Sequence, residues 1–68
     1  MKLSPRERDV LLLIVKGLNN KQIARELNLS VHTTKHHVGR LFNRIDVTSR
    51  LQAAMWYVRS FQPSAGQL

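Results

Sequence analysis

Histidines gather in the middle of the 68-residue chain, and imidazole is a side chain suited to metal binding and proton transfer. His32 and His36 stand one helical turn apart, so on a helix both could hold one metal ion. A catalytic zinc usually needs a third protein ligand, and no Asp, Glu or Cys is near on that face. The sequence also lacks a suitable carboxylate pair, a glycine-rich phosphate loop and a nucleophile beside an acid–base pair. We therefore expect no enzyme, no catalytic residues, no metal and no cofactor.

Cationic side chains surround these histidines and suit contact with a polyanion. The chain has 11 Lys and Arg against 4 Asp and Glu, a formal net charge of +7. A charge of this size indicates a nucleic acid or an anionic membrane surface, although many small domains are basic merely for solubility. The longest apolar run, Val10 to Val15, is far too short to cross a bilayer. Because composition leaves these interpretations open, the placement of the charges has to separate them.

The sequence pattern predicts an all-α domain over residues 1–62, followed by a flexible tail at 63–68. The four helices are expected at about residues 5–16, 21–27, 31–45 and 50–60. Ser4 and Glu7 have the spacing of a capping box, and Asn20 is expected to cap the second helix. Asn28 would end that helix in a left-handed conformation, and Ser30 would cap the third. A turn of only about three residues between two helices is typical of a helix-turn-helix.

The predicted helix at 31–45 has two chemically different sides. Its apolar line is formed by Thr34, Val38, Leu41 and Ile45, which recur at spacings of four, three and four. At 100° per residue, the side roughly opposite carries His32, His36, Gly39 and Asn43, and the flanks carry Lys35, His37, Arg40 and Arg44. An apolar side that faces a core and a basic side that faces away are what a helix needs to read a DNA groove.

A DNA interpretation divides these side chains by role. Base edges would be contacted by Lys35, His36, Arg40 and His32, because Lys and Arg favour the O6 and N7 atoms of guanine. Phosphates would be contacted by Asn20, Lys21, Ser30, Thr33, His37 and Arg44, which are polar or near helix starts. Each side chain alone is more simply a solvated surface group. Together, on one face of the second helix of a tight pair, they favour double-stranded DNA as the partner.

Long stretches of the sequence closely resemble the LuxR/NarL/GerE-type helix-turn-helix domain. The resemblance is carried by residues 3–11 and 17–24, by Leu29, Ser30, Thr33, Lys35, His37 and Val38, and by residues 49, 50 and 52–54. It implies a four-helix output domain of a bacterial transcription regulator, often the C-terminal part of a response regulator or quorum-sensing receptor. It also implies DNA contacts at Lys21, Thr33, Lys35, His36, His37 and Gly39 or Arg40, and dimerisation through the last helix.

Three positions depart from that family pattern. Thr34 stands where the family usually has Val, and its hydroxyl can bond back to the carbonyl of Ser30. Asp46 replaces a common Gly at a helix end. Gly39 occupies a position that often carries a side chain reaching DNA, so either the backbone approaches DNA closely or base reading passes to His36 and Arg40. We favour the second interpretation.

The predicted last helix has apolar residues with nothing in the sequence to cover them. Leu51, Met55 and Val58 form a stripe, which is explained better by a two-fold partner than by scattered surface residues. Leu12 on the first helix could meet a regulatory domain outside the chain. We therefore expect a homodimer on an inverted repeat, in the bacterial cytoplasm at the nucleoid, with RNA polymerase as a further partner. The alternative is a protein-interaction module that binds a polymerase subunit or an anti-activator.

Overall fold

The computed structural model describes residues 3–61, which form four helices and no strand. The helices are α1 (Pro5–Val15), α2 (Asn20–Leu27), α3 (Val31–Ile45) and α4 (Arg50–Phe61). The predicted all-α fold is confirmed, and each predicted helix end lies within one residue of the observed end. The predicted tail at 63–68 lies outside the described residues, as do positions 1, 2 and 62 of the predicted domain.

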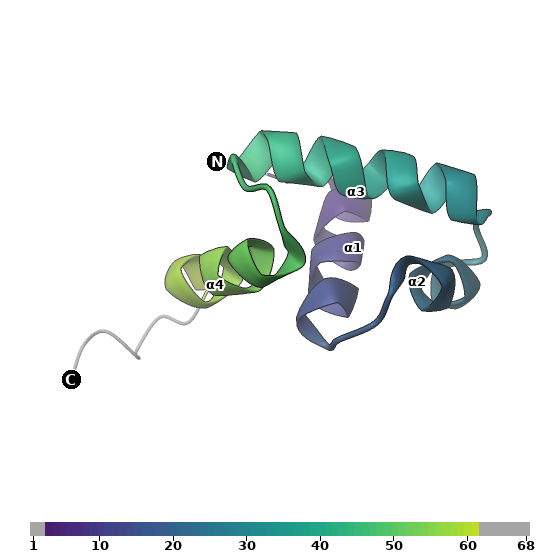
Figure 1. Cartoon of the computed structure of the whole chain (residues 1–68), viewed down its shortest axis with the longest axis horizontal. Helices are drawn as coiled ribbons and strands as arrows, with labels where there is room; N and C mark the ends of the chain where they lie inside the picture. The colour runs from purple at the N-terminus through teal and green to yellow at the C-terminus, as the bar shows by residue number, and fades with distance from the viewer. Residues whose placement is uncertain (1–2, 62–68) are drawn as a thin grey trace.

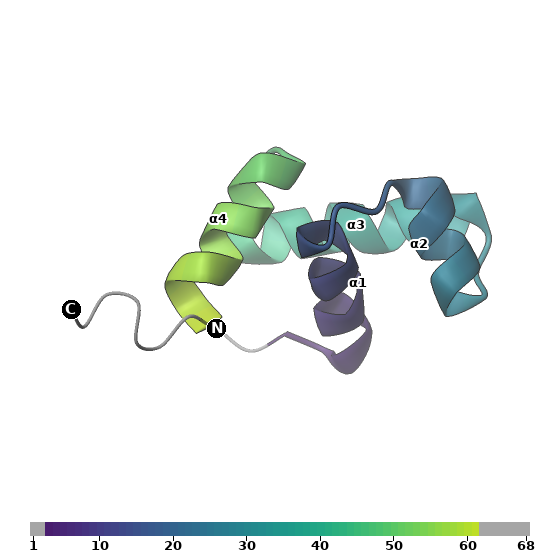
Figure 2. The same cartoon turned by 90° about the horizontal axis from the view of Figure 1, so that it is seen from below.

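Helix α3 runs along one side of the molecule, and the other three helices all lie on the same side of α3, below it in Figure 1. Seen from below, α1 and α2 lie in front of α3 (Figure 2). Helix α1 contacts each of the other three helices and therefore sits at the centre of the fold. This arrangement leaves the face of α3 that points away from α1 without a helix against it.

The core forms where α1 meets α2, α3 and α4. Its most deeply buried apolar side chains are Val10, Leu11, Ile23, Leu41 and Ala53. The predicted apolar line of α3 is confirmed, because all four of its residues are buried. Burial of this line fixes the rotation of α3 and so decides which side chains face solvent.

Thr34 is a polar member of that buried line, and its hydroxyl is satisfied locally. The Thr34 Oγ1 atom donates to the carbonyl oxygen of Ser30 at 2.9 Å, as the sequence predicted. A buried hydroxyl without such a bond would cost free energy, so this bond is what allows threonine at a core position.

Helix caps set where each helix begins. Ser4 and Glu7 form the predicted capping box of α1. For α2 the prediction was wrong by one residue, because Asn19 and not Asn20 is the cap: its Oδ1 accepts from the N–H of Gln22 at 2.8 Å. Gln22 returns a bond by accepting from the N–H of Asn19 at 2.8 Å, and only Asn19 has an amide side chain three residues later.

A residue with a positive φ follows each of the first three helices within two positions and lets the chain turn. The left-handed conformation predicted at Asn28 (φ 58°) is confirmed, and Gly17 (φ 94°) and Asp46 (φ 59°) also have a positive φ. Asparagine and aspartate tolerate this conformation better than most residues other than glycine. No helix within residues 3–61 has both the length and the apolar character needed to cross a membrane.

Candidate nucleic-acid interface

The turn between α2 and α3 is held by backbone bonds and by the first residues of α3. The N–H of Leu29 donates to the carbonyl of Ala24 at 2.8 Å and closes the end of α2. Ser30 caps α3 by accepting from the N–H of Thr33 at 3.0 Å, and its hydroxyl donates to Thr33 Oγ1 at 2.9 Å. Ser30 is therefore engaged as a cap, whereas the Thr33 hydroxyl can still donate to a phosphate.

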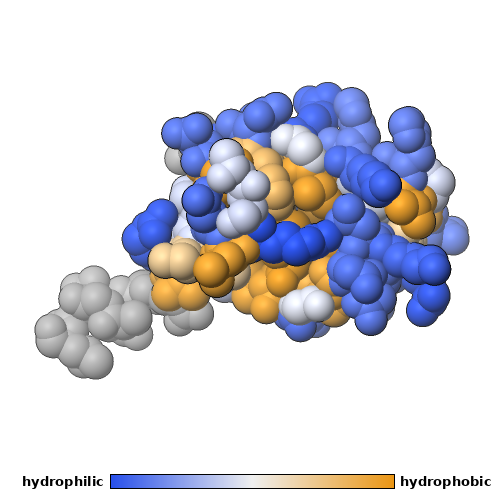
Figure 3. Space-filling view, in the orientation of Figure 1, coloured by the Kyte–Doolittle hydropathy of each residue, from blue (hydrophilic) through white to orange (hydrophobic). Residues whose placement is uncertain are grey.

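The four candidate base-contacting side chains lie together on the uncovered face of α3. His32, Lys35, His36 and Arg40 are all exposed. His37, a candidate phosphate contact, is half-buried, and its ring lies edge-on to that of His36 with the ring centres 6.3 Å apart. In the space-filling view, hydrophilic surface follows the upper and right-hand sides of the molecule, over α3 and α2 (Figure 3). A basic, hydrogen-bonding surface on this helix is what the sequence predicted.

Gly39 leaves a gap in that surface. The position is exposed and helical, and a Cβ atom built on it would have nothing within 4 Å apart from its own helix and chain neighbours. Glycine therefore has no steric role inside the protein here. The absence of its side chain matters only for what contacts α3 from outside.

Gly39→Ala is expected to raise the free energy of unfolding by about 1 kcal/mol, because alanine loses less backbone entropy in a helix and no neighbour opposes its methyl group. Urea unfolding of both proteins measures the change. A destabilised alanine variant would show that Gly39 is held in contact with another part of the chain.

Asn20 has a structural partner that the sequence did not reveal. The guanidinium of Arg50, at the start of α4, donates to Asn20 Oδ1 and to the carbonyl oxygen of Leu18, the latter at 3.4 Å. These bonds join the start of α4 to the start of α2. Of the Asn20 side chain, only the amide nitrogen is left for the phosphate contact predicted from the sequence.

Lys21, on the next position of α2, is fully available. It is exposed, and within residues 3–61 its side chain makes no hydrogen bond or ion pair. Its position at the start of α2, close in sequence to the turn that leads into α3, fits a cation that meets a phosphate at the edge of the groove.

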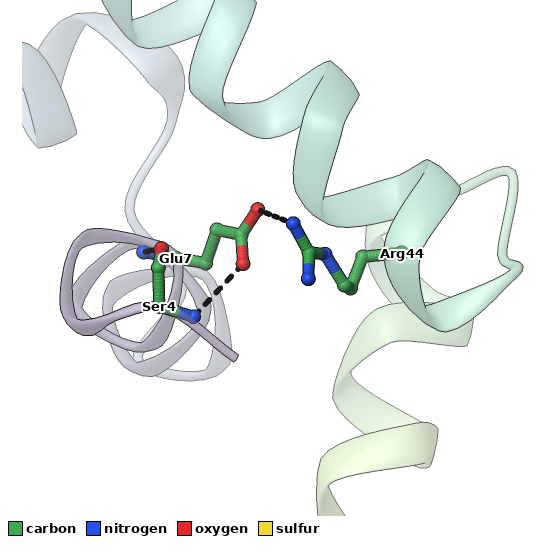
Figure 4. A network of polar contacts seen from close by, with 3 residues as sticks. All are labelled: Ser4, Glu7 and Arg44. Carbon is green, nitrogen blue, oxygen red and sulfur yellow. Dashed lines mark hydrogen bonds and ion pairs between the residues drawn. The ribbon is translucent and has the colours of Figure 1, made fainter. Parts of the chain in front are cut away.

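Arg44 lies beside a buried carboxylate of α1 (Figure 4). Its guanidinium is 3.5 Å from Glu7 Oε2, and the Glu7 side chain is only 4% exposed. Glu7 Oε1 accepts from the N–H of Ser4 at 3.0 Å, and Ser4 Oγ accepts from the N–H of Glu7 at 3.2 Å. The capping carboxylate of α1 therefore also attaches α1 to the C-terminal half of α3.

The environment of Glu7 favours its charged form. The hydrogen bond from the Ser4 backbone is the largest effect and lowers the pKa of the carboxyl. Burial acts in the opposite direction, but the positive charge of Arg44 and the Ser4 side chain add to the lowering, so the pKa of Glu7 lies below its ordinary value. Glu7 is thus ionised at neutral pH and balances one of the cations on α3.

The apolar stripe predicted on α4 is exposed in the structure. Leu51, Met55 and Val58 are 70%, 50% and 48% exposed. Trp56, unassigned from the sequence, is half-buried and packs against the core, as does Tyr57. Within residues 3–61, no three His, Cys, Asp or Glu side chains come together as a metal site.

Comparison with known proteins identifies relatives over most of the chain. Residues 1–57 match the family model described as bacterial regulatory proteins, luxR family, which is a class of regulators and not of enzymes. The nitrate/nitrite response regulator protein NarL of Escherichia coli (strain K12) is 48% identical over 54 residues, 79% of this chain and 25% of the relative. The transcriptional regulatory protein LiaR of Bacillus subtilis (strain 168) is 38% identical over 58 residues, 85% of this chain and 28% of the relative. The chain thus spans about a quarter of the length of these relatives.

Proposed function

Because the chain belongs to the luxR family of bacterial regulatory proteins, we propose that it binds double-stranded DNA and regulates transcription. The observation that carries the proposal is the exposed, basic face of α3, whose opposite face is buried in the core. The major groove is about 12 Å wide and accepts an α-helix of about 10–12 Å diameter. In this proposal α3 lies in that groove and reads the sequence.

The side chains of α3 would divide the contacts by their position around the helix. Lys35 and Arg40 would donate to guanine, with His36 and His32 as further donors or acceptors to base edges. Thr33 and His37 would meet phosphates at one flank, and Lys21 would meet one from the start of α2. Because phosphate contacts carry no sequence information, specificity would come from the first group alone.

The two interpretations of Gly39 differ in what they require of the DNA complex. If the α3 backbone approached DNA closely at Gly39, even a methyl group there would weaken binding. If His36 and Arg40 read the bases instead, Gly39→Ala would bind the operator as tightly as the wild-type domain. The open space around Gly39 agrees with either, and we favour the second because both neighbouring side chains are exposed.

The proposal is tested by fluorescence anisotropy of labelled operator DNA at increasing salt. Log K should fall as log salt rises, with a slope of about −0.9 for each phosphate that a cationic side chain neutralises. Operator DNA should be bound far more tightly than random DNA at each salt concentration. A flat salt response would remove the DNA proposal, and equal affinity for random DNA would remove its sequence-specific part.

We also propose that the domain pairs through α4 on an inverted repeat. Leu51, Met55 and Val58 would meet the same residues of a second copy, and symmetry would place the two α3 helices about 34 Å apart, one DNA turn. Sedimentation equilibrium of the wild-type domain and of Met55→Asp, on DNA with two half-sites, tests this pairing. Identical stoichiometry and affinity for the two proteins would contradict it.

The relatives suggest the setting in which the domain works. Because the relatives are about four times longer, we propose that an N-terminal regulatory domain controls this domain in a response regulator. The protein would act in the bacterial cytoplasm, at the nucleoid, and contact RNA polymerase. A pure protein-interaction module is the alternative, and it predicts that charge reversal at Lys35 and Arg40 leaves partner binding intact.

A further inference from the structure

A basic hollow lies between the start of α1 and one flank of α3, and the contacts proposed above do not use all of it. It is lined by Ser4, Arg6, Glu7, His36, His37, Arg40 and Arg44. Three arginines face a single carboxylate in this set, so the hollow is cationic even before the imidazoles are counted. We refer to it as the α1–α3 hollow.

The single carboxylate of the hollow is already fully engaged. Glu7 accepts from the Ser4 N–H and pairs with Arg44, so it holds Arg44 against the wall and neutralises one positive charge. Because Arg40 is proposed above to contact bases, the charge of Arg6 remains for a further ligand. A ligand of this surface must therefore be an anion.

Arg6 is held only weakly in its present position. Its guanidinium is 3.7 Å from Asp9 Oδ2, one turn along α1, and the two side chains are 42% and 51% exposed. An exposed pair of this kind contributes about 0–1 kcal/mol, so an anion with better geometry can take Arg6 from Asp9. A guanidinium binds phosphate through two parallel hydrogen bonds, which Asp9 at this distance does not provide.

The place of the hollow on α3 indicates which anion this is. At 100° per residue, His37, Arg40 and Arg44 share one flank of α3, beside the exposed face at His36. When a helix lies in the major groove, its flanks face the phosphates that border the groove. We propose that the α1–α3 hollow binds a phosphodiester group of the DNA backbone through Arg6, beside the phosphate contact proposed for His37, which makes α1 part of the DNA interface. This inference rests on the proposed function.

The test compares the DNA affinity and salt slope of Arg6→Gln with those of the wild-type domain. The variant is expected to bind about three- to tenfold more weakly at 100 mM salt, on operator and random DNA alike. Its salt slope is expected to be less steep by about 0.9, the contribution of one phosphate contact. Arg6→Lys, which keeps the charge, should retain most of the slope.

Two matched variants separate this effect from a general loss of charge or of helix stability. Lys16→Gln removes an exposed cation at the C-terminal end of α1, away from the hollow, and it should change the slope little. Asp9→Asn removes the competing carboxylate, so it should bind DNA as tightly as the wild-type domain or more tightly. Thermal unfolding of each variant confirms that it is folded.

Each other outcome contradicts the proposal that the α1–α3 hollow binds a phosphate. An unchanged salt slope for Arg6→Gln, with normal DNA binding by the wild-type domain, would contradict the phosphate contact at the hollow but not the proposed function. Equal weakening by Arg6→Gln and Asp9→Asn would mean that the pair supports α1 and not DNA. A loss of sequence preference in Arg6→Gln would assign Arg6 to bases. If the wild-type domain itself does not bind DNA, the proposed function is wrong, and so is the phosphate contact at the hollow.

Discussion

Glu7→Ala is expected to lower the free energy of unfolding by about 2 kcal/mol, and the melting temperature by roughly 8–16 °C. One carboxylate serves two helices here, since it accepts the Ser4 N–H at the start of α1 and pairs with Arg44 on α3. Alanine would leave the Ser4 N–H without its partner and Arg44 without its balancing charge. Thermal denaturation followed by circular dichroism at pH 7 measures the loss.

Asp9→Asn is the matched control for this result. Asp9 is an acidic residue on the same helix, but its side chain is 51% exposed and, within residues 3–61, pairs only with Arg6. Its removal should change stability by less than about 0.5 kcal/mol. Equal losses for the two variants would contradict a special role for the buried carboxylate.

The stability that Glu7 contributes depends on pH in a direction fixed by its lowered pKa. A carboxyl whose pKa is lower in the folded than in the unfolded state stabilises the fold above its unfolded pKa, about 4.3. That contribution is lost as the pH falls from there through the folded pKa. The gap in stability between wild type and Glu7→Ala should therefore be constant near neutral pH and shrink below about pH 4.3. A stability gap that widens on acidification would contradict a lowered pKa of Glu7 in the folded state.

Helices and their caps could be predicted because local chemistry decides them. The spacing of Ser4 and Glu7, the buried line of α3 and the bond from Thr34 to Ser30 all depend on residues within a few positions of each other. The one cap that was predicted at the wrong residue also depends on local spacing. Asn19 and Asn20 both have the right side chain, and the deciding residue is Gln22, three positions after Asn19.

The contacts between helices could not be predicted in the same way. Glu7 and Arg44 are 37 positions apart, and Arg50 and Asn20 are 30 positions apart. No spacing rule connects such residues, because their meeting depends on how α1 packs against α3 and how α4 begins. The sequence predicts phosphate contacts at Arg44 and Asn20, and the structure adds that each side chain has a partner within the protein.

The candidate DNA-contacting side chains differ in whether they already have a partner within the protein. The side chains of Lys35 and Lys21 have no hydrogen bond or ion pair within residues 3–61, so nothing in the described chain competes with DNA for their charges. Arg44 would have to share its guanidinium with Glu7. A variant of Lys35 should therefore report on DNA contact more directly than a variant of Arg44, whose loss would also disturb the fold.

Lys35→Ala is expected to weaken operator binding by about 1–3 kcal/mol, roughly 5- to 150-fold, and to relax the choice of base at one position of each half-site. The side chain is exposed on α3, one turn from Gly39, and its ammonium would donate to guanine O6 or N7. Because the residue contacts nothing that supports the core, the melting temperature should stay nearly unchanged. Anisotropy titrations against an operator and a set of single-base variants measure both effects.

Lys21→Ala is the comparison variant that separates a phosphate contact from a base contact. Lys21 is also exposed and carries the same charge, but it lies at the start of α2 and would meet a phosphate. Its loss should weaken all DNA sequences by the same factor and make the salt slope less steep by about 0.9. If Lys35→Ala also weakened all sequences equally, Lys35 would be a second phosphate contact, and base reading would have to come from His36 and Arg40. The pattern across sequences, more than the size of the loss, therefore decides whether α3 reads bases through Lys35.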